Sequence, residues 1–486
     1  MQKRICILLA LLLALPLTGC GEDTATTDTK DTTEDTQTVA DATETENEGE
    51  DDLPADLHYG GADFAFHTRE KPYFHGNINV EESNGEQLND ALYNRARFVE
   101  ERLGVVFTET VDEDGNDKVK AMIQAGDTTY KVITARNSET VHNAAEGLVR
   151  PMDTLTYVDL TKPYWDDSIN SCLTIAGTAF TAVGSYNLPS YDFTHALLFN
   201  KDMATDLALE SPYDMVKEGR WTFDAFRQFG STAIADTDGN GTFDLNDRYG
   251  YVAGAKQIPS SFWISAGVQG IYKDENDIPQ FTLGADEKFM DVLLSVYEVI
   301  WDTGMWYVYT PADNMPQSSI DLFSQNQALL MDVTFYYVES FRDMEADFGI
   351  LPYPKYDEAQ DKYYSRIEAG ELPYVPVILS DADADMAGAV LEALASYSYQ
   401  YVIPVYYDTY LKSKNTRDEE SAEMLDILFE NRVFDLSDTV WCDQIRDAFI
   451  YRSFSTNNRN LTSQIAASTK SIQENIDSVV AGFIKE

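Results

Sequence analysis

A run of twelve residues near the middle of the chain carries oxygen-bearing side chains at regular spacing. Asp236, Asp238, Asn240, Asp244 and Asp247 occupy its first, third, fifth, ninth and twelfth positions, with Gly241 at the sixth. Thr242 adds a backbone carbonyl at the seventh position. A hard cation needs several converging oxygens, and calcium-binding loops use this spacing. The sequence therefore predicts one Ca²⁺ ion, held by Asp236, Asp238, Asn240, Thr242, Asp244 and Asp247.

The same residue types also make ordinary solvated turns, which is the alternative for this loop. Asp247 stands where an EF-hand has glutamate, and in this respect the loop resembles those of dockerins. Residues 249–252 have the pattern of a strand rather than of the second EF-hand helix. This context favours a structural ion over a calcium switch.

Aromatic residues make up 12% of the chain and are candidates for ligand contact. Sugar rings present apolar C–H faces that stack on aromatic rings, while Asn, Asp and Arg side chains bind their hydroxyl groups. Trp263 and Tyr336 stand beside small or polar residues at the ends of predicted elements, and Asp192 is a polar candidate. Packing in the core is the alternative for each aromatic residue.

No catalytic motif stands out in the sequence. It contains only five histidines, and it lacks a nucleophile elbow, a histidine-rich metal motif and a glycine-rich phosphate loop. A carboxylate pair for glycoside hydrolysis is defined by its separation in space, so a sequence with 83 acidic residues cannot locate one. We therefore predict a protein that is not an enzyme, with a surface glycoside hydrolase as the open alternative.

The N-terminus has the pattern of a lipoprotein signal peptide. Lys3 and Arg4 precede an apolar run over residues 5–17, which is shorter than a membrane-spanning helix requires. The run ends in Leu17-Thr18-Gly19-Cys20, which resembles a lipobox. The sequence predicts cleavage after residue 19, lipidation of Cys20 and anchoring on the extracellular face of the cell membrane. An uncleaved anchor helix is the alternative.

Residues 20–57 are predicted to form a disordered acidic tether. Residues 21–57 contain fourteen acidic residues, one lysine and few large apolar side chains, so burial cannot offset the entropy of ordering them. The formal net charge of the whole chain is −48, which argues against nucleic acid as a partner. Neutral or cationic ligands are compatible with this charge.

Two cysteines remain after the signal peptide and Cys20. Cys172 and Cys442 lie far apart in the sequence, with no CxxC motif or Cys/His cluster around them. They are either buried thiols or one disulfide bridge.

From residue 58 onward, strand and helix patterns alternate. Predicted strands cover 63–68, 105–110 and 130–135, and predicted helices cover 88–103 and 117–125. Such alternation predicts a parallel sheet covered by helices, with its ligand crevice beyond the carboxyl ends of the strands. Arg136 and Asn137 follow one such end and are candidate ligand contacts. Alternatively, Asn137 and Ser138 only turn the chain and cap a helix that starts at Glu139.

The 429 residues beyond the tether exceed what one hydrophobic core usually organises. We predict an α/β fold of two lobes with several hinge crossings, a hairpin over 173–184, and apolar strands at 196–199 and 373–379 near the crossings. Lobe 1 is predicted to contain residues 58–195 and 372–430, and lobe 2 residues 196–371 and 431–486.

Five stretches resemble one protein family. They are residues 197–202 (Leu-Leu-Phe-Asn-Lys-Asp), 219–224 (Gly-Arg-Trp-Thr-Phe-Asp), 323–331 (Phe-Ser-Gln-Asn-Gln-Ala-Leu-Leu-Met), 347–355 (Asp-Phe-Gly-Ile-Leu-Pro-Tyr-Pro-Lys) and 416–425 (Thr-Arg-Asp-Glu-Glu-Ser-Ala-Glu-Met-Leu). In this order behind a lipobox, they resemble extracellular solute-binding proteins of carbohydrate ABC transporters, the group that includes maltose-binding proteins. The resemblance implies a periplasmic-binding-protein-like fold whose lobes close on a sugar, and delivery of that sugar to permease subunits. It also implies that Phe335, Tyr336 and Tyr337 lie where the second lobe contributes an aromatic residue to the pocket.

The sequence thus predicts a monomeric, lipid-anchored receptor for a small solute, in particular a sugar or oligosaccharide. Besides the hydrolase, a calcium-stabilised surface adhesin or sensor module is an alternative. The identity of the sugar depends on a few side chains whose positions in space the sequence does not reveal.

Overall fold

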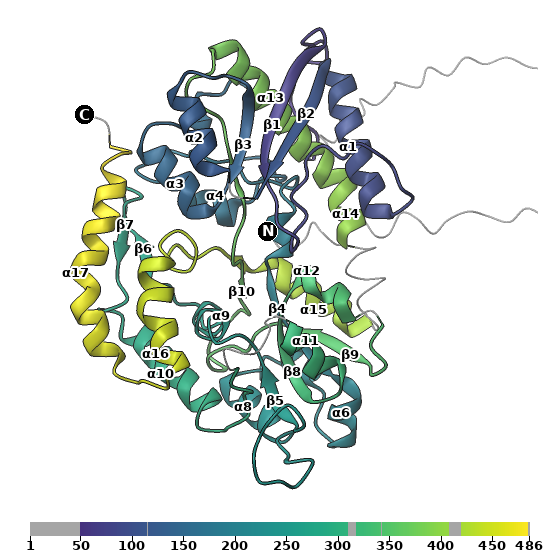
Figure 1. Ribbon diagram of the computed structural model, residues 1–486, viewed down its shortest axis with the longest axis vertical. Helices are drawn as coiled ribbons and strands as arrows, with labels where there is room; N and C mark the ends of the chain where they lie inside the picture. The colour runs from purple at the N-terminus through teal and green to yellow at the C-terminus, as the bar shows by residue number, and fades with distance from the viewer. Residues whose placement is uncertain (1–48, 114, 310–316, 342, 408–418, 485–486) are drawn as a thin grey trace, which may run out of the picture. The chain divides into compact units, whose positions relative to one another are not determined.

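The computed structural model describes residues 49–113, 115–309, 317–341, 343–407 and 419–484. Its first sheet has four strands in the order β11-β3-β1-β2. Figure 1 labels β3, β1 and β2 of this sheet. These strands are β1 (Ala62–Arg69), β2 (Val105–Asp112), β3 (Tyr130–Ala135) and β11 (Leu372–Tyr374). β1 pairs in parallel with β2 and β3, whereas β11 pairs antiparallel with β3. The parallel arrangement predicted for the first three strands is therefore confirmed.

Helices cover both faces of this sheet. Val132 of β3 packs in one hydrophobic cluster with residues of α1 and α13, and its neighbour Ile133 packs in another with residues of α2 and α3. Adjacent side chains of a strand point to opposite faces, so both faces are buried. The helices are α1 (Gln87–Leu103), α2 (Asn116–Gln124), α3 (Asn137–Ala145) and α13 (Asp381–Tyr397).

Helix α1 shows how local sequence sets an element. Its buried side chains include Leu92, Ala96, Val99 and Leu103, at the three- and four-residue spacing of one helical face. Gly104 ends the helix in the left-handed conformation, with φ of 62°, and strand β2 begins at the next residue.

The second sheet has the order β5-β8-β4-β9 (Figure 1). β4 pairs antiparallel with β8 and β9, and β8 pairs in parallel with β5. Every residue of β4 is buried, which explains its nearly continuous apolar sequence. The strands are β4 (His195–Asn200), β5 (Tyr249–Val252), β8 (Ala328–Thr334) and β9 (Phe348–Leu351).

Helices of the second sheet include α8, which contacts β5, α11, which contacts β8, and α15, which contacts β9. Thr222 caps α8 by accepting the backbone N–H of Ala225 on its side-chain oxygen. The helices around this sheet are α5 (Pro189–Asp192), α6 (Lys201–Asp206), α7 (Pro212–Lys217), α8 (Phe223–Ser231), α9 (Gln257–Ser265), α10 (Glu287–Ile300), α11 (Gln317–Ser324), α12 (Phe335–Val338), η3 (Glu339–Phe341) and α15 (Glu419–Glu430).

Two small sheets and the C-terminal helices complete the described chain. β10 pairs in parallel with β12, β6 pairs antiparallel with β7, and α17 contacts both β7 and α3. These elements are β6 (Ile271–Lys273), β7 (Pro279–Phe281), β10 (Ser365–Arg366), β12 (Arg432–Val433), η6 (Asp443–Ile450), α16 (Tyr451–Ser455) and α17 (Leu461–Val480). The remaining helical segments are η2 (Met152–Thr154), α4 (Asp167–Leu173), η4 (Ser398–Val402) and α14 (Ile403–Val405).

The end of the predicted tether differs from the expectation. Residues 49–57 were predicted to belong to the disordered tether, but Leu53 is only 8% exposed and lies in the hydrophobic cluster of α1 and α13. Asp51 also forms an ion pair with Arg102. Lys162 also pairs with Asp52, and Ser396 donates to the Gly49 carbonyl, so these contacts hold the acidic stretch on the first sheet's helices and loops. The predicted signal peptide, Cys20 and residues 20–48 lie outside the described residues.

Two further details differ from the sequence expectations. The predicted boundaries place residues 419–430 in lobe 1, whereas α15 packs on β9 of the second sheet. The segment 173–184 has a single bridge, between Ile175 and Thr178, in place of a full hairpin. The α/β class is confirmed, and the other lobe boundaries stay predictions. Among the described residues, no helix combines the length and apolar character needed to cross a membrane.

Candidate ligand-binding cavity

A cavity of about 970 Å³ is lined by residues that follow or end strands of both four-stranded sheets. The first sheet contributes Arg69 at the end of β1, Arg136 and Asn137 after β3, and Glu371 before β11. The second sheet contributes His195 at the start of β4 and residues 331–334 of β8. The cavity therefore draws on segments that are far apart in the sequence.

Charged side chains from distant parts of the sequence meet at the first-sheet wall. Strands β1 and β3 are parallel, so their carboxyl ends share one edge, and β11 is antiparallel, so its amino end lies there too. The guanidinium of Arg69 pairs with the carboxylate of Glu371, and both side chains are buried. The backbone N–H of Arg69 donates to the Thr134 hydroxyl at 2.8 Å.

The predicted contacts Arg136 and Asn137 both lie on this wall. Asn137 is 6% exposed, and its side-chain oxygen accepts the backbone N–H of Gly370 at 3.1 Å. This bond positions the segment that carries Glu371. Arg136 donates its backbone N–H to Glu139 at 3.2 Å, and helix α3 starts at Asn137. The predicted capping is wrong, because α3 already begins at Asn137 and has Arg136 at its N-cap. Arg136 and Asn137 do lie on the cavity wall, and their contact with a ligand stays a prediction.

The second-sheet wall is built around His195. Its Nδ1 lies 2.8 Å from Asp332 and its Nε2 lies 3.2 Å from Glu368, while the Tyr353 hydroxyl donates to Asp332 at 2.6 Å. Burial is the largest single effect and would lower the pKa of His195. Asp332 and Glu368 together outweigh it, so the pKa is raised. The guanidinium of Arg366, which lies 3.1 Å from Nε2, opposes this rise.

A buried ion cluster joins this wall to the C-terminal segment. Asp438 accepts two bonds from Arg366, at 2.6 and 3.1 Å, and one from Arg446 at 3.0 Å. Asp438 and Arg366 are at most 1% exposed. Burial alone would raise the pKa of Glu368, but Arg366 and His195 hold it well below its usual range. The charges on this side of the cavity therefore neutralise one another.

Aromatic side chains line much of the remaining surface. Tyr73, Phe193, Trp306, Tyr309 and Tyr337 are among them. The Trp306 indole donates to the Ala253 carbonyl at 2.9 Å and packs at right angles on Trp301, with ring centroids 5.1 Å apart. These contacts hold the ring in place, and only a small part of Trp306, 4%, is exposed.

Only one of the four predicted aromatic contacts lines the cavity, and it is Tyr337. Trp263 is fully buried in the core against Phe289, with ring centroids 5.6 Å apart. Phe335 is also fully buried and stacks on Phe429. The Tyr336 hydroxyl donates to the Pro72 carbonyl at 2.8 Å. The geometry therefore gives Trp263 and Phe335 packing roles, because their rings are enclosed by neighbouring apolar side chains.

Asp192, the remaining predicted contact, is fully buried beside the cavity-lining loop that carries Tyr73. Its carboxylate accepts the backbone N–H of His75 at 2.6 Å and the Tyr406 hydroxyl at 2.9 Å, and it lies 2.9 Å from His75 Nδ1. Burial is the largest single effect and would lower the pKa of His75. The charge and the hydrogen bond of Asp192 together outweigh it, so the pKa is raised. Asp192 thus positions the loop and does not line the cavity.

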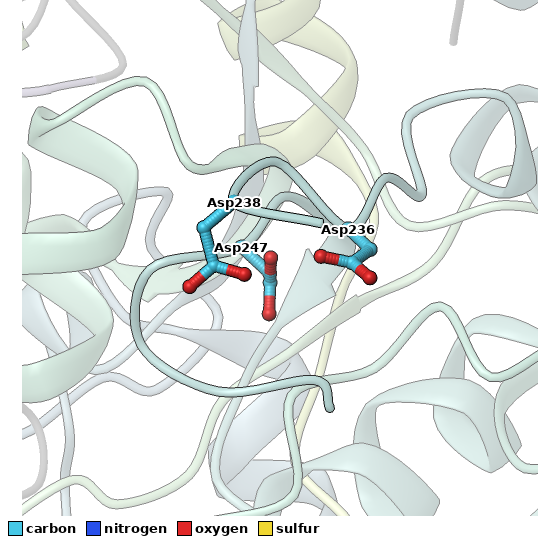
Figure 2. A group of neighbouring side chains, drawn as sticks. All are labelled: Asp236, Asp238 and Asp247. Atoms are coloured by element: carbon cyan, nitrogen blue, oxygen red, sulfur yellow. The ribbon is translucent and has the colours of Figure 1, made fainter. Parts of the chain in front are cut away.

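The predicted calcium loop brings three carboxylates together, as Figure 2 shows. One oxygen each from Asp236, Asp238 and Asp247 lie within 4.8 Å of one another. The Asp236 carboxylate accepts the N–H groups of Gly239 at 2.7 Å and Gly241 at 2.8 Å, and these bonds curl the loop around it.

The other predicted ligands of the loop hold its shape. The Asn240 side chain accepts the Thr242 N–H at 2.6 Å, and Asp244 accepts the Asn246 N–H at 2.8 Å. The Tyr249 hydroxyl donates to the Asp244 carbonyl at 3.0 Å, which ties the loop to β5. The oxygen-rich donor set fits a hard divalent cation such as Ca²⁺.

Both cysteines have free thiols. The Cys172 thiol donates to the Phe434 carbonyl at 3.0 Å, whereas Cys442 lines the cavity. Burial raises the pKa of Cys172 to about 12 and that of Cys442 to about 11. Of the two alternatives, free thiols describe this structure, although both residues are partly rather than fully buried.

Most of the charged lining was not predicted from the sequence, including Arg69, His195, Glu368 and Glu371. One signal was within reach, because Arg69 directly follows the first predicted strand and the rule applied to Arg136 applies to it equally. His195, Glu368 and Glu371 reach the cavity only through antiparallel pairing and bridges between distant segments. No local pattern marks them.

The arrangement of these sheets is that of the solute-binding proteins of ABC transporters, and the predicted two-lobed periplasmic-binding-protein-like fold class is confirmed. The chain is similar to a sugar-binding protein, MalE, from Xanthomonas citri, with a TM-score of 0.59, 12% identity, and coverage of 86% of this chain and 98% of that one. It is also similar to the ABC substrate-binding protein Lmo0181 from Listeria monocytogenes in complex with cycloalternan, with a TM-score of 0.55, 13% identity, and coverage of 86% and 99%.

A third similar structure is the maltose/maltodextrin-binding domain MalE from Bdellovibrio bacteriovorus bound to maltotriose. Its TM-score is 0.54, with 14% identity and coverage of 86% of this chain and 100% of that one. At these identities the likeness lies in the fold. No family model matches the sequence, and no curated protein matches it.

Proposed function

We propose that this chain is an extracellular solute-binding receptor that captures a neutral oligosaccharide and delivers it to the permease of an ABC importer. The observation that carries the proposal is the cavity between strand ends of two α/β sheets, which combines aromatic faces with polar groups. Its volume of about 970 Å³ is at the upper end of the range for small-molecule sites. The similar structures named above, two of which are complexes with cycloalternan and with maltotriose, support the same proposal.

The charge of the lining favours a neutral ligand. It includes four lysine or arginine and five aspartate or glutamate side chains. Arg69 pairs with Glu371 and Arg446 pairs with Asp438. Glu368 also pairs with His195, so little charge is left over for an ionic ligand. Carboxylates and guanidinium groups held in such pairs can still accept from and donate to hydroxyl groups.

The test is isothermal titration of the purified chain with neutral oligosaccharides, beginning with maltotriose. We expect saturable binding of one sugar per chain, a smaller radius of gyration at saturation because the two sheets close on the ligand, and recovery of the sugar intact after hours. We expect the receptor to act as a monomer, since one chain supplies the whole lining described above. Turnover of the sugar would support the hydrolase, and no binding across the panel would contradict the receptor.

Replacing Tyr337 measures the aromatic contribution. If a sugar ring stacks on it, Tyr337→Ala should lose about 0.5 to 1.5 kcal/mol of binding, which is about 2- to 13-fold in affinity. The matched control is Tyr401→Ala, because Tyr401 is 55% exposed and does not line the cavity. Equal affinities of the Tyr337→Ala variant and the wild type would exclude stacking there.

We further propose that the loop at 236–247 binds one structural Ca²⁺ ion through the six predicted residues. An ion that binds only the folded state, present at 100 times its dissociation constant, stabilises by about 2.7 kcal/mol. We therefore expect a chelator to lower the melting temperature of the wild type and to leave that of an Asp236→Ala/Asp238→Ala variant unchanged. Asp274→Ala is the control, because Asp274 also accepts backbone N–H groups in a turn but belongs to no such cluster. An unaffected wild type would make the loop an ordinary turn.

Membrane attachment through a lipid on Cys20 completes the proposal. It is supported by the charged start, the short apolar run and the Leu-Thr-Gly-Cys sequence. We expect mass spectrometry of the mature protein to find a lipidated N-terminus at Cys20, and a Cys20→Ala variant to be released from the membrane fraction. An intact N-terminus at Met1 would contradict both the cleavage and the anchor.

A further inference from the structure

The pair formed by Arg69 and Glu371 has hydrogen-bonding capacity to spare. One carboxylate oxygen of Glu371 takes a bond from the Arg69 guanidinium. Within the described part of the chain, the other oxygen, Oε2, has no partner, and neither does Nε of Arg69. Buried polar atoms nearly always have partners, and exceptions in native structures call for an explanation. Both residues line the cavity, so a ligand bound there would explain the missing partners.

The backbone of Glu371 is also unusual. Its φ of 44° lies in the left-handed region, which costs a side-chain-bearing residue free energy that glycine does not incur. The surrounding structure enforces this conformation. Asn187 donates its side-chain N–H to the Glu371 carbonyl at 2.9 Å, and Asn137 accepts the N–H of the preceding Gly370. Two buried asparagines thus hold a strained glutamate at the edge of the cavity.

A purely structural pair explains these features less well. Strand β3 lies between β1 and β11 and is hydrogen-bonded to both, so the sheet does not need this ion pair to hold the strands together. A structural carboxylate would also be expected to use both oxygens. Backbone strain and unsatisfied groups together are typical of functional sites.

We propose that Glu371 and Arg69 recognise two adjacent hydroxyl groups of the bound sugar, with Glu371 accepting an O–H and Arg69 donating to the neighbouring oxygen. Because Oε2 is enclosed in the structure, this contact requires a rotation about the terminal torsion of Glu371, whose energy profile is broad. This inference rests on the proposed function and assigns the side chains that select for a vicinal diol. A site built to bind a hydroxyl discriminates strongly against analogues that lack it.

The binding test uses maltotriose and its monodeoxy analogues in isothermal titration. We expect Glu371→Gln to weaken maltotriose binding at least tenfold. For the one analogue that lacks the recognised hydroxyl, the variant and the wild type should bind equally. A residue that only braces the sheet would weaken all analogues by the same factor.

The matched control is Glu392→Gln. Glu392 is as buried as Glu371 but lies outside the cavity, where its carboxylate accepts the Tyr164 hydroxyl. We expect this variant to bind maltotriose with wild-type affinity. If the wild type binds maltotriose and Glu371→Gln binds it equally well, the inference is wrong and the proposed function stands.

A second measurement needs no ligand and decides the inference even if maltotriose does not bind. If the pair is kept for a ligand, folding does not depend on it. We therefore expect the double variant Arg69→Gln/Glu371→Gly, which relieves the backbone strain and removes both charges, to melt no lower than the wild type. A clearly lower melting temperature would show that the pair is structural and would overturn the inference, whereas absence of maltotriose binding alone counts against the proposed function.

Discussion

We expect the Asp438→Asn variant to lose about 3 to 5 kcal/mol of unfolding free energy, because it removes the carboxylate that two buried guanidinium groups share. Asp438 receives bonds from Arg366 and Arg446, and the side chains of Asp438 and Arg366 are fully buried. Asparagine has nearly the same shape but no charge. The loss therefore measures the cost of leaving Arg366 without its main partner rather than the cost of a cavity.

The effect has a defined pH dependence. Burial is the largest single effect and would raise the pKa of Asp438. Arg366 and Arg446 together outweigh it, so the pKa in the folded state is lowered. The stabilisation is therefore fully present above the unfolded-state pKa of about 3.9 and is lost as the pH falls through the folded-state value. Urea denaturation at several pH values should show a constant difference between wild type and variant near neutrality and a smaller one in acid.

The control for this experiment is Asp302→Asn. Asp302 pairs with Arg459 at the surface, where both side chains are substantially exposed, so its replacement should change stability by at most about 1 kcal/mol. If Asp438→Asn were as mild as this control, Arg366 would have to find other partners, and the cluster would not be a fixed part of the cavity wall.

The second large effect is expected at Trp263, one of the aromatic residues that were predicted from the sequence to contact the ligand. Trp263 lies in α9 with no exposed surface and packs on Phe289 of α10. Removal of such a side chain leaves a cavity and costs roughly 3 to 5 kcal/mol. We expect Trp263→Ala to be destabilised by this amount in chemical denaturation, while its folded fraction binds ligand with unchanged affinity.

Trp263→Phe keeps the experiment informative if the alanine variant does not fold. Phenylalanine retains most of the packing and removes the indole N–H, which has no partner among the described residues. We expect this variant to fold and to bind like the wild type. A tenfold loss of affinity at full stability would restore the original prediction that Trp263 contacts the sugar.

Local sequence was sufficient where neighbouring residues decide the structure. The predicted strand over 130–135 coincides with β3, and the predicted helix over 88–103 ends at Gly104 as α1 does. The loop over 236–247 is also set locally, since most of its hydrogen bonds join residues within five positions of one another. Alternation of strands and helices was enough to predict the α/β class and the sheet edge at which Arg136 and Asn137 lie.

The composition of the cavity could not be obtained in this way. Trp263 follows Phe262 and Trp306 precedes Tyr307 in the sequence, yet Trp263 is enclosed by the core whereas Trp306 lines the cavity. Which face of a helix or loop is covered depends on the elements that pack against it. Periodicity identifies a buried face but not the partner that buries it.

The sequence by itself determined the strands and helices at the start of the first sheet, the α/β class, the calcium-loop pattern and one edge of the site, because these follow from residue spacing over short distances. It did not determine the segment 173–184, or the strand predicted over 373–379, which is only Leu372–Tyr374. Only the tertiary structure decided which charges meet. Arg69 and Glu371 are separated by 302 positions, and His195 meets Asp332 across 137. These contacts arise because antiparallel pairing of β11 with β3 and of β4 with β8 brings distant residues to the same strand ends.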